Sequence, residues 1–182
     1  GTTHVVRGEE WLSSLPKHIE MFNALGIEPP KYIHSPLIMK KDEETGKLRK
    51  ISKRKDPEAI MTYYSEHGYP TLAVIESLMT IINTNYEEWH TNNPDKSYLD
   101  FTYSPKKMSA SGGLYDLDKL INISKTIISK MTKEELCDEA YNWASSYSDE
   151  LKELIDQDKD YFMNIINIER EQKKPRKDIA KY

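Results

Sequence analysis

The sequence predicts a mostly α-helical protein with a few short strands, which is an α+β fold. Two apolar runs near the start, at residues 4–8 and 32–39, are short and are bounded or interrupted by glycine and proline, as is typical of strands. From residue 56 onward, apolar residues instead recur every three or four positions behind residues that favour helix N-termini. We therefore expect helices to form most of the structure.

The first elements are expected to be a strand and a helix. Residues 4–8 form a short apolar run that ends at a glycine, which indicates a buried strand. Ser13 or Ser14 can then cap a helix that carries Pro16 in its first turn. Gly26 is the natural end of that helix, because glycine readily adopts the left-handed conformation found there.

A second strand is expected at residues 32–39, interrupted by Pro36. The basic residues 40–55 should follow as a loop. Residues 56–58 (Asp-Pro-Glu) then form a strong helix start: aspartate can cap, proline fits the first helical position, and glutamate favours the positive end. This helix is expected to end near Gly68.

The middle of the chain should alternate short elements. A helix beginning by Pro70 runs to about residue 83 and is followed by a polar stretch. Alternation of apolar and polar residues over positions 99–103 predicts a short strand. Residues 105–109 resemble a single helical turn, and Gly112-Gly113 marks a tight turn.

Four helices should fill the last third of the chain. Their expected starts are Asp116, a capping box of Thr132 with Glu135, Ser148 with Asp149, and Asp160. The last of these helices should cover residues 160–172 and run into the basic stretch 173–177.

Composition excludes several protein classes. The 182 residues are 37% apolar and 31% charged, as in soluble globular proteins, and contain no run long enough to span a membrane. A single cysteine, Cys137, excludes an internal disulfide and fits a reducing compartment. Because the chain begins at Gly1 without a methionine, we expect it to be a piece of a longer protein.

Metal binding and nucleophilic catalysis lack a signature in this sequence. The five histidines are His4, His18, His34, His67 and His90. They show no paired helical spacing and have no cysteine partners, so no metal site is expected. Cys137 is expected in a helix core rather than as a nucleophile, and neither a Walker nor a Rossmann glycine motif is present.

Basic residues concentrate in one segment of an otherwise acidic chain. The net charge is −4, but residues 40–55 carry eight Lys/Arg and three Asp/Glu. Such a segment indicates a specific anionic target such as phosphates, although a solvated basic loop would have the same composition. Within it, Lys50 and Lys53 supply point charges, Ser52 a hydroxyl and Arg54 a forked donor that could wrap a polyphosphate.

Several motifs carry a resemblance to a known family. Residues 50–54 (KISKR) resemble the KMSKS signature of class I aminoacyl-tRNA synthetases, in the form typical of glutamyl enzymes. Residues 6–16 (VRGEEWLSSLP) resemble the glutamyl-tRNA synthetase segment of the VIRGEEWL type, in the family's order and at about its spacing. Residues 25–30 (LGIEPP), 68–70 (GYP) and 101–119, the last similar to a stem-contact segment, extend the resemblance.

The resemblance implies a fold and a division of the chain. It implies the C-terminal part of a class I synthetase nucleotide-binding domain, followed by a stem-contact helical region. Residues 1–83 would complete the catalytic domain with the KISKR loop, 84–130 would form the stem-contact region, and 131–182 would lead to an anticodon-binding domain. The HIGH signature is absent and would lie upstream of Gly1, so this chain alone is expected to be inactive.

The resemblance also implies roles at the amino-acid pocket. Arg7 matches the arginine that pairs with a carboxylate of the substrate glutamate, and Glu10 lies in the same substrate-binding motif. Trp11 matches the tryptophan at the pocket for ATP and the amino acid. An ion pair of Arg7 with Glu9, Glu10 or another acid, and core packing of Trp11, are the structural alternatives.

At the phosphates, the resemblance implies that Lys50, Ser52, Lys53 and Arg54 are catalytic, with Lys50 and Lys53 contacting ATP. Such a site works by positioning and charge neutralisation, without a protein nucleophile. An insertion at residues 40–46 lengthens the loop before the KISKR segment, and its role stays open.

The implied activity is that of a glutamate–tRNA ligase in protein translation. The implied substrates and partners are ATP with Mg²⁺, L-glutamate and tRNA(Glu), in a cytoplasmic and monomeric enzyme that makes no membrane contact. Two alternatives stay open: a non-catalytic tRNA-binding module, and a related enzyme that glutamylates a tRNA base.

Overall fold

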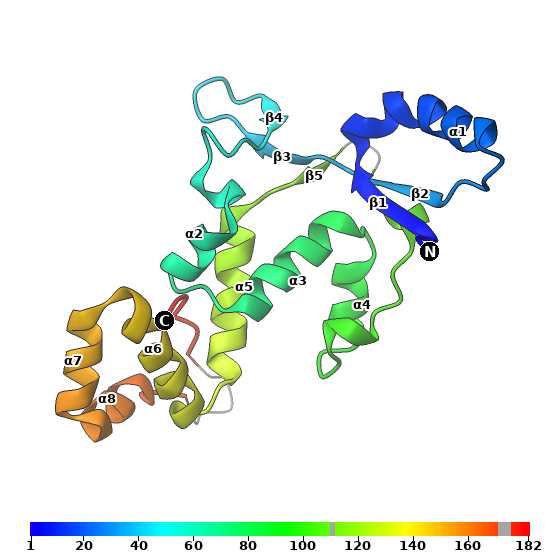
Figure 1. Cartoon of the computed structure of the whole chain (residues 1–182). Coiled ribbons are helices and arrows are strands. Elements are labelled where there is room, and N and C mark those ends of the chain that lie inside the picture. Colours follow the sequence, from blue (N-terminus) through cyan, green and yellow to red (C-terminus); the bar gives the residue numbers. More distant parts are fainter. Residues whose placement is uncertain (110–111, 171–175) are drawn as a thin grey trace. The chain divides into compact units, whose positions relative to one another are not determined.

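Helices form most of the chain, and the few strands are short, which confirms the expected fold class (Figure 1). The computed structural model describes residues 1–109, 112–170 and 176–182. It divides into two units: unit 1 comprises Gly1–Ile51 and Met79–Tyr115, and unit 2 comprises Ser52–Leu78 and Asp116–Tyr182. The expected functional boundaries at residues 83 and 130 stay predictions.

Unit 1 begins with a strand–helix–strand motif. Strand β1 (His4–Gly8) pairs in parallel with β2 (Lys31–Ser35), and between them lie the 3₁₀ helix η1 (Glu9–Ser14) and helix α1 (Leu15–Ala24). The predicted strand and helix are therefore confirmed, with η1 inserted between them. The prediction that the strand is buried is wrong, since Val6 is 65% exposed, and the Ser14 side chain does not cap α1. Gly26 follows α1 with φ of 66°, as expected of a helix end.

The second expected strand is indeed broken at Pro36, and its two halves enter different sheets. Strand β3 (Ile38–Lys41) is the centre of a three-stranded sheet, antiparallel to β4 (Leu48–Lys50) and parallel to β5 (Gly113–Leu114). The prediction that residues 40–55 form only a loop is wrong for β4. A tight turn with Gly46 at φ of 68° folds β4 back onto β3 in register, so its backbone is paired.

Residues 86–107 of unit 1 form one short α-helix and two 3₁₀ helices. Helix α4 (Tyr86–Asn92) occupies the stretch expected to be polar and irregular, and η4 (Pro105–Lys107) confirms the predicted single turn. The strand predicted at residues 99–103 is wrong. A capping box between Ser97 and Asp100 instead starts the 3₁₀ helix η3 (Tyr98–Asp100), because these side chains satisfy the backbone N–H groups locally.

Close approach of the backbone explains the glycine pair at residues 112–113. Gly112 has φ of 88°, as expected of a turn, whereas Gly113 begins β5. A Cβ at Gly113 would lie 2.9 Å from the carbonyl oxygen of Ile81 and would also clash with the Ile81 side chain. Residues 110–111 lie outside the described residues.

Unit 2 starts with two short helices where one was expected. The 3₁₀ helix η2 (Pro57–Ala59) and helix α2 (Met61–Glu66) are separated by Ile60, whose backbone is extended with φ of −110° and ψ of 130°. Asp56 is not the expected side-chain cap, because its carboxylate accepts a hydrogen bond from the Ser52 N–H instead. Helix α3 (Thr71–Ile82) follows, as predicted.

Four capped helices complete unit 2. They are α5 (Leu117–Lys130), α6 (Lys133–Tyr147), α7 (Asp149–Gln157) and α8 (Lys159–Ile166). The predicted caps Asp116, Thr132 and Ser148 are confirmed by side-chain hydrogen bonds. Helix α8 starts one residue before the predicted position, since Asp158 caps it, and ends at Ile166. Residues 171–175 of the predicted helix and basic stretch lie outside the described residues.

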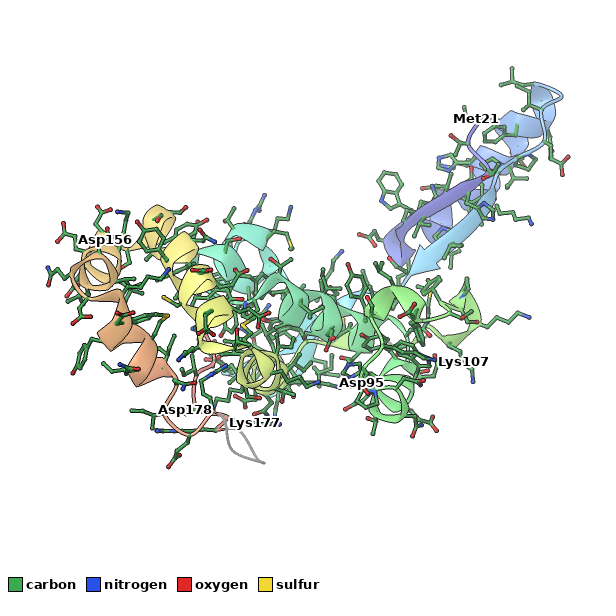
Figure 2. All side chains as sticks on the ribbon, turned by 90° about the horizontal axis from the view of Figure 1, so that it is seen from below. Met21, Asp95, Lys107, Asp156, Lys177 and Asp178 are labelled. Carbon is green, nitrogen blue, oxygen red and sulfur yellow. The ribbon has the colours of Figure 1, made fainter. Side chains whose placement is uncertain are left out.

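The buried apolar side chains of unit 2 lie mainly on α2, α3, α5, α6 and α7. They include Leu120, Ile128, Leu136, Cys137 and Ile155. Burial raises the pKa of the Cys137 thiol, which agrees with a core position rather than a nucleophile. Figure 2 shows the side chains of the protein as sticks on the ribbon. No helix among the described residues is sufficiently long and apolar to cross a bilayer.

The capping box of α6 yields a stability prediction. The Thr132 hydroxyl accepts from the Glu135 N–H at 3.1 Å, and the Glu135 carboxylate accepts from the Thr132 N–H at 2.8 Å. Thr132→Ala should lower the local opening free energy at the start of α6 by about 1 kcal/mol. Hydrogen exchange of the first α6 amides in the full-length protein measures this. Thr102→Ala, at an exposed site outside the helices, is the matched control, and equal exchange in both variants would contradict the capping role.

Candidate functional site

Parallel pairing of β1 and β2 places Arg7 directly opposite His34. The Arg7 Nε–H donates to His34 Nε2 at 3.1 Å. From helix α1, His18 presents Nδ1 to Arg7 Nη1 at 3.0 Å, and the Trp11 carbonyl accepts from Nη2 at 3.3 Å. The guanidinium is therefore held by three elements of unit 1: β2, α1 and η1.

The chemistry of guanidinium fixes the state of both histidines. An arginine side chain has five N–H donors and no acceptor, so each facing imidazole nitrogen must accept. His34 then carries its proton on Nδ1 and His18 carries its proton on Nε2, and both rings are neutral. Within residues 1–109, 112–170 and 176–182, three of the five donors are used in this way, which leaves one N–H on each terminal nitrogen of Arg7.

Aromatic rings cover the flat face of the same guanidinium. The Arg7 Cζ lies 4.9 Å from the centre of the Tyr32 ring and 6.0 Å from that of Trp11. Tyr32 in turn stacks on His18 and on His34, with ring centres 6.5 and 6.4 Å apart. These half-buried rings leave the guanidinium little freedom to rotate.

Neither structural alternative considered for these residues is observed. In the described part of the chain, the partners of Arg7 are imidazoles, a carbonyl and aromatic faces rather than a carboxylate. Trp11 is 51% exposed and is therefore not a core residue. Both side chains keep surface available for a ligand.

Glu10 pairs with Lys50, the first residue of the KISKR segment. The Lys50 ammonium lies 3.1 Å from Glu10 Oε1, and both side chains are about half exposed. A hydrogen bond from its own backbone and the bond from Lys50 lower the pKa of Glu10. A Cβ at Gly8 would meet the far end of the Glu10 side chain, which would then have to shift. Lys50 is the last residue of β4, not part of a loop as expected.

The rest of the segment forms a turn at the start of unit 2. The buried Asp56 carboxylate accepts from the Ser52 N–H at 2.8 Å, and the Ser52 carbonyl accepts from the N–H groups of Lys55 and Asp56. The Lys53 and Arg54 side chains are exposed, and no side-chain partner for either is found among residues 1–109, 112–170 and 176–182.

The expected site residues fall in both units. Arg7, Glu10, Trp11 and Lys50 belong to unit 1, whereas Ser52, Lys53 and Arg54 belong to unit 2. Convergence of Arg7 and Lys53 on one ligand stays a prediction. The residues that hold Arg7 were missed, namely His18, Tyr32 and His34. Tyr32 and His34 alternate on the second predicted strand, and parallel pairing with the first strand was the available signal.

The insertion before the KISKR segment is a structured hairpin turn. The Asp42 carboxylate accepts from the Thr45 N–H and hydroxyl, both at 2.9 Å, and pairs with Arg49 at 2.9 Å. These donors, led by the Thr45 N–H, lower the pKa of Asp42 from 3.8 to about 2. The turn thereby holds β4, and with it Lys50, in register on β3.

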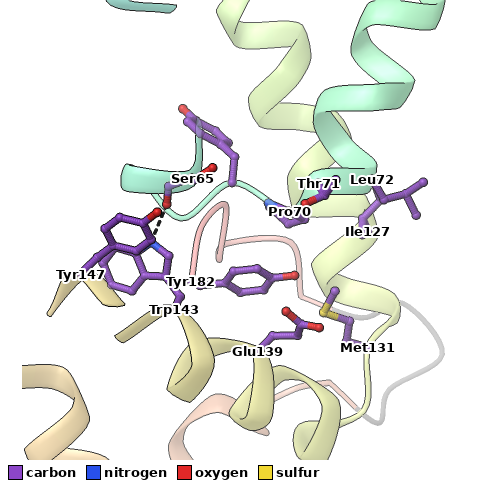
Figure 3. Close-up of a pocket in the computed structure, with 11 residues that line it drawn as sticks. Ser65, Pro70, Thr71, Leu72, Ile127, Met131, Glu139, Trp143, Tyr147 and Tyr182 are labelled. Carbon is purple, nitrogen blue, oxygen red and sulfur yellow. Dashed lines mark hydrogen bonds between the residues drawn. The ribbon is translucent and has the colours of Figure 1, made fainter. Parts of the chain in front are cut away.

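A hollow lies in unit 2, with a volume of about 370 Å³ (Figure 3). Its aromatic lining includes Tyr69, Trp143, Tyr147 and Tyr182, and the Trp143 indole N–H donates to the Ser65 carbonyl at 2.8 Å. Burial and the nearby Glu139 raise the pKa of Tyr182 to about 12. None of the predicted site residues lines this hollow.

Metal ligation by the protein finds no support in the residues that the structure describes, where no cluster of three or more His, Cys, Asp or Glu side chains is found. The chemistry of the candidate site is instead cationic. Arg7 offers two free N–H groups beside aromatic faces, and Lys53 and Arg54 offer exposed charge. Carboxylates and phosphates are the ligands that suit these donors.

The Asp42 turn yields a pH prediction. Because its folded pKa is lowered, the charged Asp42 stabilises the hairpin fully above pH 3.8, and this stabilisation is lost as the pH falls toward about 2. Amide exchange at residues 42–47, taken relative to the intrinsic rate at each pH, should therefore accelerate below about pH 4. Asp42→Asn should abolish this dependence, whereas Glu43→Gln in the same turn should keep it. Identical profiles for all three proteins would contradict the role of Asp42.

Comparisons with known proteins identify a family and several relatives of this chain. A family model described as "tRNA synthetases class I (E and Q), catalytic domain" matches residues 1–109. The glutamate–tRNA ligase of Clostridium perfringens strain 13 is 51% identical over 181 residues, covering 100% of this chain and 33% of the relative. That of Acetivibrio thermocellus is 48% identical over 177 residues, covering 97% and 32%. The chain thus spans about a third of the length of these relatives.

Solved structures show the same fold. The glutamate–tRNA synthetase of Elizabethkingia anophelis superposes with a TM-score of 0.67 at 20% identity, covering 93% of this chain and 35% of that one. A glutamate–tRNA ligase from Elizabethkingia meningosepticum, solved with its amino acid, gives a TM-score of 0.62 at 22% identity, covering 91% and 36%.

Proposed function

The chain belongs to the class I tRNA synthetases for glutamate and glutamine, and we propose that it is the part of a glutamate–tRNA ligase that grips glutamate and the phosphates of ATP. The family match over residues 1–109 carries this proposal, because both Arg7 and the KISKR segment lie inside it. The relatives named glutamate–tRNA ligase favour this activity over a purely RNA-binding module or a base-glutamylating enzyme.

The proposed reaction has two steps. A carboxylate oxygen of the glutamate α-carboxyl attacks the α-phosphorus of ATP, and pyrophosphate leaves with the electron pair of the broken P–O bond. A terminal ribose hydroxyl of tRNA(Glu) then attacks the carbonyl carbon of the adenylate, loses its proton, and releases AMP. Neither step needs a protein nucleophile, so the protein contributes position and charge.

Arg7 and Trp11 are the proposed contacts to glutamate. The two remaining N–H groups of Arg7, one on each terminal nitrogen, match the two oxygens of a carboxylate. The half-exposed Trp11 offers a flat apolar face beside that guanidinium for the amino acid or the adenine of ATP. Glu10 supports the pocket through Lys50, which it holds at 3.1 Å.

Lys50, Ser52, Lys53 and Arg54 are the proposed contacts to the phosphates of ATP. The exposed charge of this segment supports the assignment, because the Lys53 and Arg54 side chains reach solvent. The turn that carries them is fixed by Asp56 rather than by their own side chains. Mg²⁺, arriving with ATP, would add neutralisation of the phosphate charge.

The chain spans about a third of the length of its relatives, and we propose that the rest of the full-length protein supplies the remaining parts of the enzyme. We assign residues 84–130 to stem contacts with tRNA(Glu) and residues 131–182 to the approach to an anticodon-binding region. The enzyme is proposed to work as a cytoplasmic monomer, and activation of glutamate is assigned to the full-length protein rather than to this chain alone.

Removing the exposed ammonium of Lys53 tests the phosphate assignment. Lys53→Ala in the full-length enzyme should lower the rate of glutamate-dependent ATP–pyrophosphate exchange by roughly 100- to 1,000-fold, the effect of losing one preorganised charge of about 3–4 kcal/mol. The KM for glutamate should change little. Lys55→Ala, an exposed lysine of the same turn, is the control. An unchanged exchange rate in Lys53→Ala, measured with tRNA(Glu) present, would refute the assignment.

Replacing the forked guanidinium of Arg7 by the single ammonium of lysine tests whether Arg7 binds the substrate glutamate. Arg7→Lys should raise the KM for glutamate by roughly 10- to 100-fold, because a charge-assisted hydrogen bond to a carboxylate contributes about 1.5–3 kcal/mol. The KM for ATP should stay within about twofold in the same assay, since the phosphate contacts are untouched. An unaltered KM for glutamate would remove Arg7 from the proposed pocket.

A further inference from the structure

Among the residues that the structure describes, neutral rings and a carbonyl, rather than carboxylates, hold the half-buried Arg7. Its Nε–H and one Nη1–H end on imidazole nitrogens of His34 and His18, at 3.1 and 3.0 Å. Both histidines are half-buried, and both rings also stack on Tyr32. We infer that His18 and His34 are positioning residues which aim Arg7 at glutamate only while both imidazoles are neutral.

Protonation of either ring would reverse its contact with Arg7. A neutral imidazole accepts the Arg7 N–H, but an imidazolium has donors on both nitrogens and no acceptor. The facing nitrogens would then carry two N–H groups and two positive charges at about 3 Å, an arrangement that costs free energy. Arg7 would have to rotate away, and the pair of N–H groups left for a carboxylate would no longer point into the pocket.

Other titratable groups on the surrounding elements do not take over this role. They are His4 on β1, Glu9 and Glu10 on η1, Lys17 and Glu20 on α1, and Lys31 on β2. In the described part of the chain, none of them forms a hydrogen bond or ion pair with Arg7, and Glu10 is engaged by Lys50. The two imidazoles are therefore the groups through which a proton acts on Arg7.

The direction of the pH effect follows from these contacts. Imidazoles change charge between about pH 5 and 8, whereas the carboxylates of free glutamate remain ionised above about pH 5. Glutamate binding should therefore be strongest at neutral pH and weaken as the pH falls. This inference rests on the proposed function only in taking Arg7 as a glutamate contact.

The primary test is the pH profile of the KM for glutamate in the full-length enzyme. Between about pH 7.5 and 5.5 the KM for glutamate should rise by roughly five- to tenfold, with the KM for ATP changing less than about twofold. Pyrophosphate exchange with tRNA(Glu) present measures both constants. A flat glutamate profile in the unmodified enzyme would overturn the inference.

Two matched substitutions keep an acceptor and remove the titration. The side-chain oxygen of glutamine replaces the Nε2 acceptor in His34→Gln, and that of asparagine replaces the Nδ1 acceptor in His18→Asn. In the double variant the KM for glutamate should vary by less than about twofold over the same pH range, whatever its value at neutral pH. His4→Gln, an exposed histidine on the same strand as Arg7, should keep the original profile. A double variant that retains the pH-dependent rise would also overturn the inference.

A spectroscopic measurement tests the same geometry without activity. Nitrogen-15 chemical shifts of the imidazoles, assigned with the single variants, should show the Nδ1–H tautomer for His34 and the Nε2–H tautomer for His18. In Arg7→Lys these fixed tautomers should relax toward a mixture. Opposite tautomers in the unmodified enzyme would overturn the inference even if Arg7 proves to bind glutamate. Failure of the proposed function would differ, since Arg7→Lys would then leave the KM for glutamate unchanged.

Discussion

The parallel pairing of β1 with β2 determines the surroundings of Arg7. That register sets Arg7 opposite His34 and, because side chains alternate along a strand, keeps Tyr32 on the same face two residues earlier. The segment that connects the two strands, through η1 and α1, then places the Trp11 carbonyl and His18 within hydrogen-bonding distance of the same guanidinium. A slip of one residue would move Arg7 to the other face of the sheet and dissolve every one of these contacts.

Local chemistry made much of the fold predictable. The caps at Asp116, Thr132 and Ser148 act within one turn of their helices, so sequence spacing alone reveals them. The same holds for Gly26, where a left-handed conformation ends α1. These elements were predicted because the residue that determines the structure and the atoms it satisfies are close in sequence.

The elements that were missed depend on contacts that the sequence pattern did not single out. Strand β4 pairs with β3 across a turn, and the Asp56 carboxylate accepts from the Ser52 N–H instead of capping its own helix. The strand predicted at residues 99–103 is replaced by a 3₁₀ helix because of the local capping box between Ser97 and Asp100. The site shows the same division. Motif resemblance singled out Arg7, Trp11 and the KISKR residues, but His18 and His34, 11 and 27 residues away from Arg7, emerged only with the tertiary structure.

The neutral partners of Arg7 leave its positive charge uncompensated, whereas a carboxylate partner would compensate it. An aspartate or glutamate against Arg7 would hold the guanidinium as firmly, but it would also cancel the charge that attracts a carboxylate ligand. Imidazoles orient the fork through their lone pairs and leave its full positive charge, and two of its N–H groups, for the ligand. Orientation without neutralisation would suit the proposed role of Arg7 as a contact to a carboxylate.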